Sequence, residues 1–94
     1  MALARTAKVV VPEGVLVREL GGESVILNLN SESYFGLDDV GTRMWAALTA
    51  AESIEAACQS LLEEYDVNPE KLTEDLDALI DKLVAQGLLE VAGG

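Results

Sequence analysis

The hydrophobic pattern of the chain changes its period between residues 15 and 45, from every second position to every third or fourth. Residues 15–20 (V-L-V-R-E-L) are rich in β-branched side chains and predict a short strand. Gly21-Gly22 follows, and two adjacent glycines are typical of a two-residue hairpin turn because both accept positive φ. An antiparallel hairpin is therefore expected early in the chain.

A second strand is predicted over residues 24–29, where two sets of side chains alternate. Alternate residues of a strand point to opposite faces. The two sets are Val25, Leu27 and Leu29 on one face, and Ser24, Ile26 and Asn28 on the other. A turn at residues 30–32 separates this strand from a short third one, residues 33–36 (S-Y-F-G). The three strands are expected to form an antiparallel meander.

Three helices are predicted after residue 37, where the apolar spacing becomes helical. The expected N-caps are Asp38 or Asp39 for the first helix, Ser53 for the second, and Asn68, followed by Pro69, for the third. Gly87 is expected to end the third helix. The apolar stripes are Val40, Met44, Trp45 and Leu48; then Ile54, Ala57, Cys58, Leu61, Leu62 and Tyr65; then Leu72, Leu76, Leu79, Ile80, Leu83 and Val84. Three strands followed by three helices predict an α+β fold.

Length and charge limit the classes of function. The 94 residues make one domain, and half of them are apolar, which is enough for a core. Residues 1–12 are expected to form an N-terminal arm and residues 13–94 the domain, because Pro12 begins a turn. Residues 1–8 lack a clear period, so they are expected to be a frayed arm or a short edge segment. The net charge of −11 disfavours nucleic acid and anionic membranes as partners. No apolar run is long enough for a signal peptide or a membrane span, so a cytoplasmic protein is expected.

The chain offers little chemistry. It has no histidine, and Cys58 is its only cysteine, which excludes an intrachain disulfide and a Cys/His zinc site and fits a reducing compartment. Most of the 17 acidic residues lie on helix faces between apolar positions, as solvated carboxylates do. The two adjacent glycines join strand to strand, so they do not form a phosphate-binding loop. No catalytic residue, metal or cofactor is expected.

The third strand is the candidate binding element. Tyr34 and Phe35 point to opposite faces, so one is expected in the core and the other exposed at an edge, where aromatic residues mark interfaces. An edge strand carries unpaired N–H and C=O groups with which an extended peptide can pair. The wide apolar stripe of the third helix has two interpretations: a wide core face, or a flank that lines a groove against this strand.

The order of these segments resembles the PqqD-like family, the peptide-recognition domains of ribosomal-peptide biosynthesis. The resemblance covers residues 14–91 and rests on V-I-L-N-L-N-S-E-S-Y-F-G-L-D-D-V-G-T-R-M-W, then S-I-E-A-A-C-Q-S-L-L-E-E-Y-D-V, then L-T-E-D-L-D-A-L-I-D-K-L-V-A-Q-G-L-L. At this length, with nothing fused to it, the chain is most similar to the stand-alone leader-binding proteins of lasso-peptide clusters.

The resemblance implies a winged-helix-like fold, with a three-stranded antiparallel sheet against three helices. It also implies that the leader of a precursor peptide adds as a strand beside the third strand, with apolar side chains in a groove walled by the third helix. The residues that it assigns to peptide binding are Leu29, Ser33, Tyr34, Phe35, Gly36, Asp75, Leu76, Leu79, Ile80 and Leu83. Asp75 matches an acidic position of the family, and it either pairs with a basic leader side chain or is simply solvated.

The implied role is to deliver the precursor to a separate cysteine-protease-like leader peptidase and an asparagine-synthetase-like cyclase, without catalysis by this chain. A monomer or a weak homodimer is expected, because an exposed edge strand can pair with its own copy. Two other functions stay open at this point. A winged-helix transcription regulator is disfavoured by the negative charge and the absence of a basic helix. An acidic carrier protein is disfavoured by the strand-rich first third and by the lack of an Asp-Ser-Leu-type attachment site opening a helix.

Overall fold

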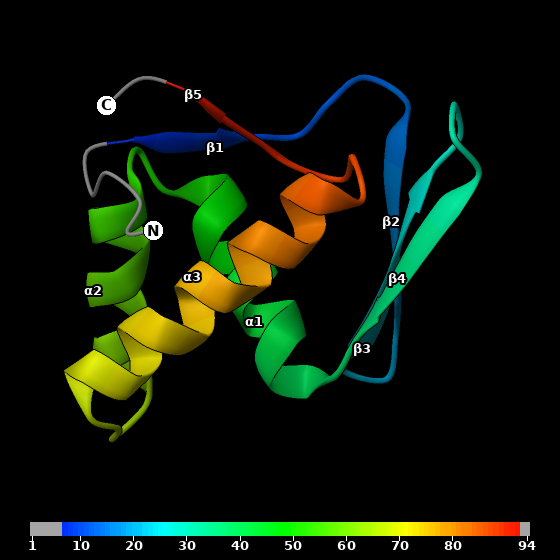
Figure 1. Cartoon of the computed structure of the whole chain (residues 1–94). Coiled ribbons are helices and arrows are strands. Elements are labelled where there is room, and N and C mark those ends of the chain that lie inside the picture. Colours follow the sequence, from blue (N-terminus) through cyan, green and yellow to red (C-terminus); the bar gives the residue numbers. More distant parts are fainter. Residues whose placement is uncertain (1–6, 93–94) are drawn as a thin grey trace.

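The computed structural model describes residues 7–92, which form a three-stranded sheet, three helices and a two-stranded ribbon (Figure 1). The strands are β1 (Lys8–Val10), β2 (Val15–Leu20), β3 (Glu23–Asn28), β4 (Ser33–Leu37) and β5 (Glu90–Ala92), and the helices are α1 (Asp39–Ala50), α2 (Ile54–Glu64) and α3 (Pro69–Ala85). Residues 1–6 of the predicted arm lie outside the described residues.

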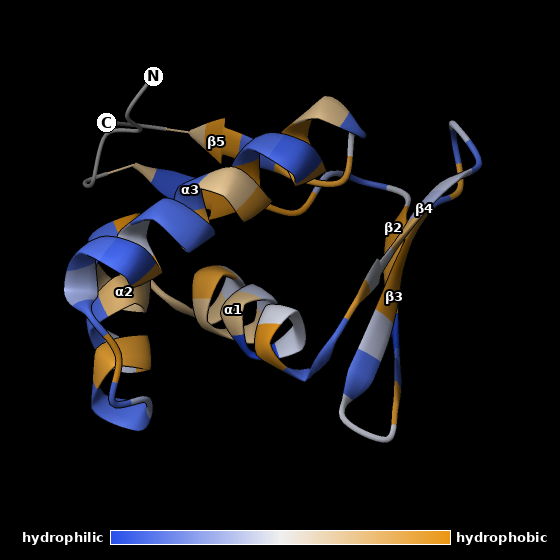
Figure 2. Cartoon of the chain, turned by 60° about the horizontal axis from the view of Figure 1, so that its bottom comes forward, coloured by the Kyte–Doolittle hydropathy of each residue, from blue (hydrophilic) through white to orange (hydrophobic). Residues whose placement is uncertain are grey.

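The main sheet has the order β2-β3-β4 with antiparallel neighbours, as the predicted meander requires. Gly21 and Gly22 both have positive φ, at 61° and 89°, which is the geometry that the two-glycine turn predicts. Ile26 lies opposite Val17 on β2 and Phe35 on β4. All three helices lie on one side of this sheet, and its other face is left open to solvent (Figures 1 and 2).

The face of β3 that packs on the helices carries the more polar of the two alternating sets of side chains. Ile26 is fully buried there, and Ser24 is 3 % exposed. The Ser24 hydroxyl is hydrogen-bonded at 2.7 Å to that of Thr42 on α1, so its burial leaves no polar atom unpaired. The Asn28 side chain donates to the Gly87 carbonyl at 2.8 Å, which ties β3 to the end of α3. Hydrogen bonding thus lets the inner face carry polar residues.

Each predicted helix start is present, with its cap bond. Asp38, rather than Asp39, caps α1 and accepts from the Gly41 N–H at 2.7 Å. Ser53 caps α2, and Asn68 caps α3 with Pro69 at the first helical position. α3 ends as predicted: Gly87 has φ 74°, and the Leu88 N–H donates to the Leu83 carbonyl at 2.8 Å.

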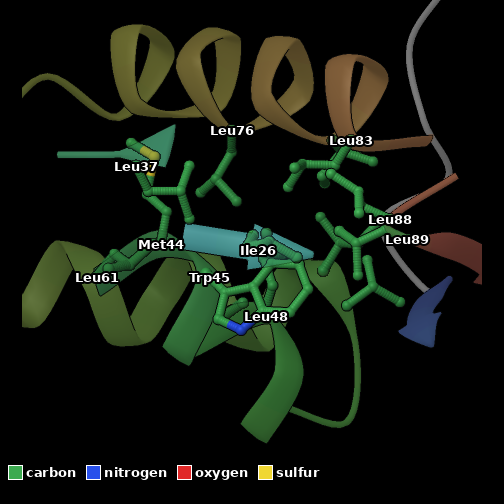
Figure 3. Packing of buried hydrophobic residues seen from close by; sticks show 14 of the residues in the cluster. Ile26, Leu37, Met44, Trp45, Leu48, Leu61, Leu76, Leu83, Leu88 and Leu89 are labelled. Atoms are coloured by element: carbon green, nitrogen blue, oxygen red, sulfur yellow. The ribbon is translucent and has the colours of Figure 1, made fainter. Parts of the chain in front are cut away.

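The core lies between the helices and the inner face of the sheet (Figure 3). Its buried members include Met44, Trp45 and Leu48 of α1, which confirms that part of the predicted stripe. The prediction that places Val40 on the core stripe of α1 is wrong, because its side chain is 43 % exposed. Val84, which widens the apolar stripe of α3, is 42 % exposed and does not belong to a wide core face. Val40 lies in the first turn of α1, where the helix leaves the sheet, and its side chain borders a hollow rather than the core.

β1 and β5 bring the two ends of the described chain together in an antiparallel ribbon that the sequence pattern does not predict (Figure 1). Ala7 and Val9 are buried in the core, and the Ile54 N–H donates to the Ala7 carbonyl at 2.8 Å. The last part of the predicted arm therefore packs with the rest of the chain. Within residues 7–92, no helix is long and apolar enough to cross a membrane.

Candidate functional site

β4 is the last strand of the sheet, and among the described residues no strand pairs with its outer edge. A hollow of about 360 Å³ lies beside it, between the strand, the start of α1 and one flank of α3. We call this hollow the β4–α3 groove. Its lining residues are Phe35, Gly36, Leu37, Asp38, Val40, Gly41, Met44, Asp75, Ala78, Leu79 and Lys82. An open strand edge and a mainly apolar groove therefore lie side by side.

The groove lining has few charged side chains, and more of them are acidic than basic. Asp38 and Asp75 are acidic, and Lys82 is the single base in the lining. Asp75 also forms an ion pair with Lys71, one turn earlier on α3, at 3.2 Å, and its side chain is 46 % exposed. Asp75 can therefore accept a further cation from a ligand, because a carboxylate has several acceptor sites.

Four of the predicted site residues line the groove: Phe35, Gly36, Asp75 and Leu79. Phe35 and Leu79 are both half-buried and pack against the core with part of their surface. Phe35 is thus the inward member of the aromatic pair. The structure brings this strand and helix together as the sequence-based hypothesis requires.

The prediction that Leu76, Ile80 and Leu83 line the groove is wrong, because all three are 0 % exposed and belong to the core. The wide apolar stripe of α3 is therefore a core face and a groove flank at the same time. One side is a core face, and the neighbouring flank carries the groove residues. These flank residues, at positions 75, 78, 79 and 82, have the i, i+3, i+4, i+7 spacing of one helix face. That spacing was the signal that could have identified Ala78 and Lys82.

Three other predicted site residues lie outside the groove lining. Tyr34 is 73 % exposed and points to the opposite side of β4 from Phe35. Leu29 is 60 % exposed and follows the end of β3. Ser33 begins β4 and is half-buried. Because only alternate residues of a strand present their N–H and C=O groups to one edge, one of Ser33 and Tyr34, but not both, can pair through its backbone with a strand added to β4.

The outer face of the sheet, which points away from the helices, carries exposed apolar side chains. Leu16, Leu27 and Tyr34 lie opposite one another across the three strands. Leu16 is 50 % exposed, and Leu20 on the same face is 74 % exposed. The strand positions on this face carry one base, Arg18, and one acid, Glu23, so the face has no net charge in a chain whose net charge is −11.

An ion pair with two hydrogen bonds lies away from the groove, between α1 and α2. Arg43 donates two hydrogen bonds to Glu64, at 2.8 and 2.7 Å. These hydrogen bonds lower the pKa of the Glu64 carboxyl below its ordinary value and raise the pKa of Arg43. Across residues 7–92, no three acidic, Cys or His side chains gather in a way that could hold a metal ion. Cys58 is half-buried, with its Sγ 3.7 Å from the Thr73 hydroxyl.

Fold and site together define a small α+β domain with a winged-helix-like arrangement and a free strand edge beside an apolar groove, a geometry suited to strand addition. The chain belongs to the PqqD family: residues 23–89 match the family model of coenzyme PQQ synthesis protein D. No curated protein matches the chain significantly.

Two solved structures are similar to this chain over nearly their whole length. One is TbiB1 in complex with the TbiA(beta) leader peptide, with a TM-score of 0.80, 30 % sequence identity, and coverage of 89 % of this chain and 98 % of that one. The other is a lasso peptide synthetase B1 complexed with the leader peptide, with a TM-score of 0.78, 23 % identity, and coverage of 88 % and 98 %. The predicted fold and family resemblance are thereby confirmed.

Proposed function

We propose that this chain captures the leader region of a ribosomally made precursor peptide and performs no chemistry itself. The leader adds as a strand to the free edge of β4 and places alternate side chains in the β4–α3 groove. The observation that carries this proposal is the open edge beside the groove in a chain of the PqqD family. It is supported by the two similar structures, each of which holds a leader peptide.

Strand pairing alone is too weak for capture. β4 has five residues, and only alternate residues present their N–H and C=O groups to one edge, so few bonds can form. Each contributes about 0.5–1.5 kcal/mol net, whereas micromolar affinity requires about 8 kcal/mol. The groove must therefore supply most of the affinity and nearly all of the specificity, through apolar side chains that cover Phe35 and Leu79.

The negative charge of the chain favours a partner with a basic side chain. Asp38 and Asp75 face the groove in a chain of net charge −11, so a leader with a basic side chain near the strand is favoured. The same charge opposes pairing between two copies, which supports a monomer as the working form. The excess of 17 acidic residues over 6 basic ones speaks against a nucleic-acid partner.

The captured precursor is handed to a cysteine-protease-like leader peptidase and an asparagine-synthetase-like cyclase in the cytoplasm. The outer face of the sheet supports this step, because it stays free while a leader occupies the edge of β4. Exposed apolar surface without net charge is typical of a protein interface. A strand added to β4 also extends this face, so an enzyme that docks there meets the protein and the leader together.

The direct experiment is a titration of the protein into a fluorescein-labelled synthetic leader, read by fluorescence polarisation. The leader sequence is first identified by a search of the neighbouring genes for a short precursor peptide. Saturable binding with a Kd of about 10⁻⁸ to 10⁻⁶ M is expected. Leu79→Asp, and Ala78→Trp at an exposed groove position, should each weaken binding by about tenfold or more. The control Leu20→Asp, on the outer face, should bind normally. Absence of binding, or normal binding by both groove variants while folded, would refute the proposal.

A further inference from the structure

A second hollow lies where the start of α1, the end of α2 and the start of α3 meet. We call it the helix-junction pocket, and its volume is about 140 Å³. Its lining residues are Val40, Met44, Leu61, Tyr65, Val67, Lys71, Leu72 and Asp75. Neither the strand-addition geometry nor the sequence pattern assigns a role to it.

The pocket has a rigid apolar floor and an exposed apolar rim. Leu61, Leu72 and Met44 are 0 %, 5 % and 7 % exposed, so the core holds the floor in place. Val40 and Val67 at the rim are 43 % and 44 % exposed. A dry cavity of about 150 Å³ in another protein accommodates benzene, so this volume suits one aromatic ring or one branched aliphatic side chain. Covering the two rim valines removes apolar surface from water.

The helix-junction pocket is continuous with the β4–α3 groove. Three residues, Val40, Met44 and Asp75, line both hollows. The β4–α3 groove is lined by Leu37 at the end of β4 and by the start of α1, whereas the pocket is lined by the start of α1 and by no residue of β4, so it adjoins the groove on the side of this strand end. A peptide that pairs with β4 and continues past that end therefore reaches this pocket next.

The charged residues at the rim indicate a second property of the peptide, besides an apolar side chain. Asp75 stands between the two hollows and is paired with Lys71, whose side chain is 69 % exposed. An ion pair this exposed is weak. A lysine or arginine of an incoming peptide can therefore take the place of Lys71 on the Asp75 carboxylate at little cost.

We propose that the helix-junction pocket is a second subsite for the leader peptide. It takes one large apolar side chain from the segment that continues beyond the strand paired with β4, and a neighbouring basic side chain of the leader binds Asp75. This inference rests on the proposed leader-binding function. It adds that recognition extends past the strand to a separate anchor, held by all three helices.

The test compares two matched variants, Val67→Asp and Val84→Asp. Val67 lines the helix-junction pocket alone, whereas Val84 is equally exposed on α3 and lines neither hollow. Binding of the labelled synthetic leader is measured by fluorescence polarisation for each variant, alongside thermal unfolding to verify the fold. Val67→Asp should weaken binding by about tenfold, and Val84→Asp should leave it unchanged within about twofold.

A second leader peptide, shortened to the strand-pairing segment alone, separates this inference from the function on which it rests. The truncated peptide should bind wild-type protein more weakly than the full leader does, and it should bind Val67→Asp and wild type equally. If folded Val67→Asp binds the full leader as tightly as wild type, the second subsite is refuted while leader binding stands. If wild-type protein binds neither peptide, the proposed function is refuted, and the subsite with it.

Discussion

The hydroxyls of Ser24 on β3 and Thr42 on α1 lie 2.7 Å apart inside the core, and their hydrogen bond fixes the sheet to the first helix. Ser24 is 3 % exposed and Thr42 is 6 % exposed, so neither hydroxyl has ready access to water. Ser24 pairs across the sheet with Leu37, the last residue of β4, and α1 starts two residues later, so this bond lies close to the junction of β4 and α1 beside the groove.

Ser24→Ala should therefore destabilise the fold by about 1–3 kcal/mol, because the Thr42 hydroxyl loses its partner in a buried place. The double variant Ser24→Ala/Thr42→Val removes both polar groups and should recover part of that loss. Urea unfolding of the wild type, the two single variants and the double variant measures this. A double variant whose loss equals the sum of the two single losses would show that the bond is not an energetic pair.

Leu76 and Leu79 are neighbours on α3 with different roles. Leu76 is 0 % exposed, and its truncation to Ala should cost about 2–5 kcal/mol of unfolding free energy. Leu79 is only half-buried and lines the groove, so Leu79→Ala should cost less stability but weaken leader binding more. Chemical unfolding and leader titration of both variants separate the two roles. Equal losses of stability with equal losses of affinity would contradict the division of α3 into a core face and a groove flank.

The Arg43–Glu64 pair predicts a pH dependence of stability. Hydrogen bonds from Arg43 lower the pKa of Glu64 below its ordinary value of 4.5, so the folded state favours the ionised carboxyl. The stabilisation is complete above that ordinary pKa and is lost as the pH falls through the lower pKa of the folded state.

Glu64→Gln should accordingly be less stable than wild type at pH 7, and the difference should shrink at acidic pH. The control is Glu63→Gln, an exposed neighbour with the same change of charge. Thermal unfolding between neutral and acidic pH gives the comparison. A stability gap between Glu64→Gln and wild type that does not narrow toward low pH would exclude this pair as its cause.

The outer face of the sheet should matter for delivery but not for capture. Leu16→Glu places a charge at the β2 end of the Leu16–Leu27–Tyr34 row, and Leu16 does not line the groove. Leader affinity should stay within about twofold of wild type. Cleavage of the precursor by the leader peptidase, assayed with purified components, should slow markedly. Val84→Glu is the matched control, and equal cleavage with both variants would exclude the outer face as the docking surface.

The element order was predictable because local patterns determine it. The cap bonds of Asp38, Ser53 and Asn68, and the positive φ of Gly21, Gly22 and Gly87, each follow from a few neighbouring residues. The groove residues Phe35 and Leu79 were also within reach, since strand alternation and helix spacing place them on particular faces.

Tertiary pairing, by contrast, could not be predicted from local pattern. The choice of the Ser24–Ile26–Asn28 face as the inner one depends on a hydrogen bond to Thr42, 18 residues away. The burial of Leu76, Ile80 and Leu83, rather than their exposure in the groove, depends on how α3 rotates over the sheet. The β1–β5 ribbon joins residues at least 80 positions apart, as in the pair Val9 and Val91.

The central claim is that the leader pairs with the free edge of β4. Amide hydrogen exchange, measured by NMR on the isotopically labelled protein with and without saturating leader peptide, tests it most directly. Amides of Ser33–Leu37 that face the free edge should exchange about tenfold more slowly in the complex, whereas those at the outer edge of β2, Val15–Leu20, should be unchanged. Unchanged exchange in β4 at saturation, or protection that appears along β2 instead, would contradict the claim.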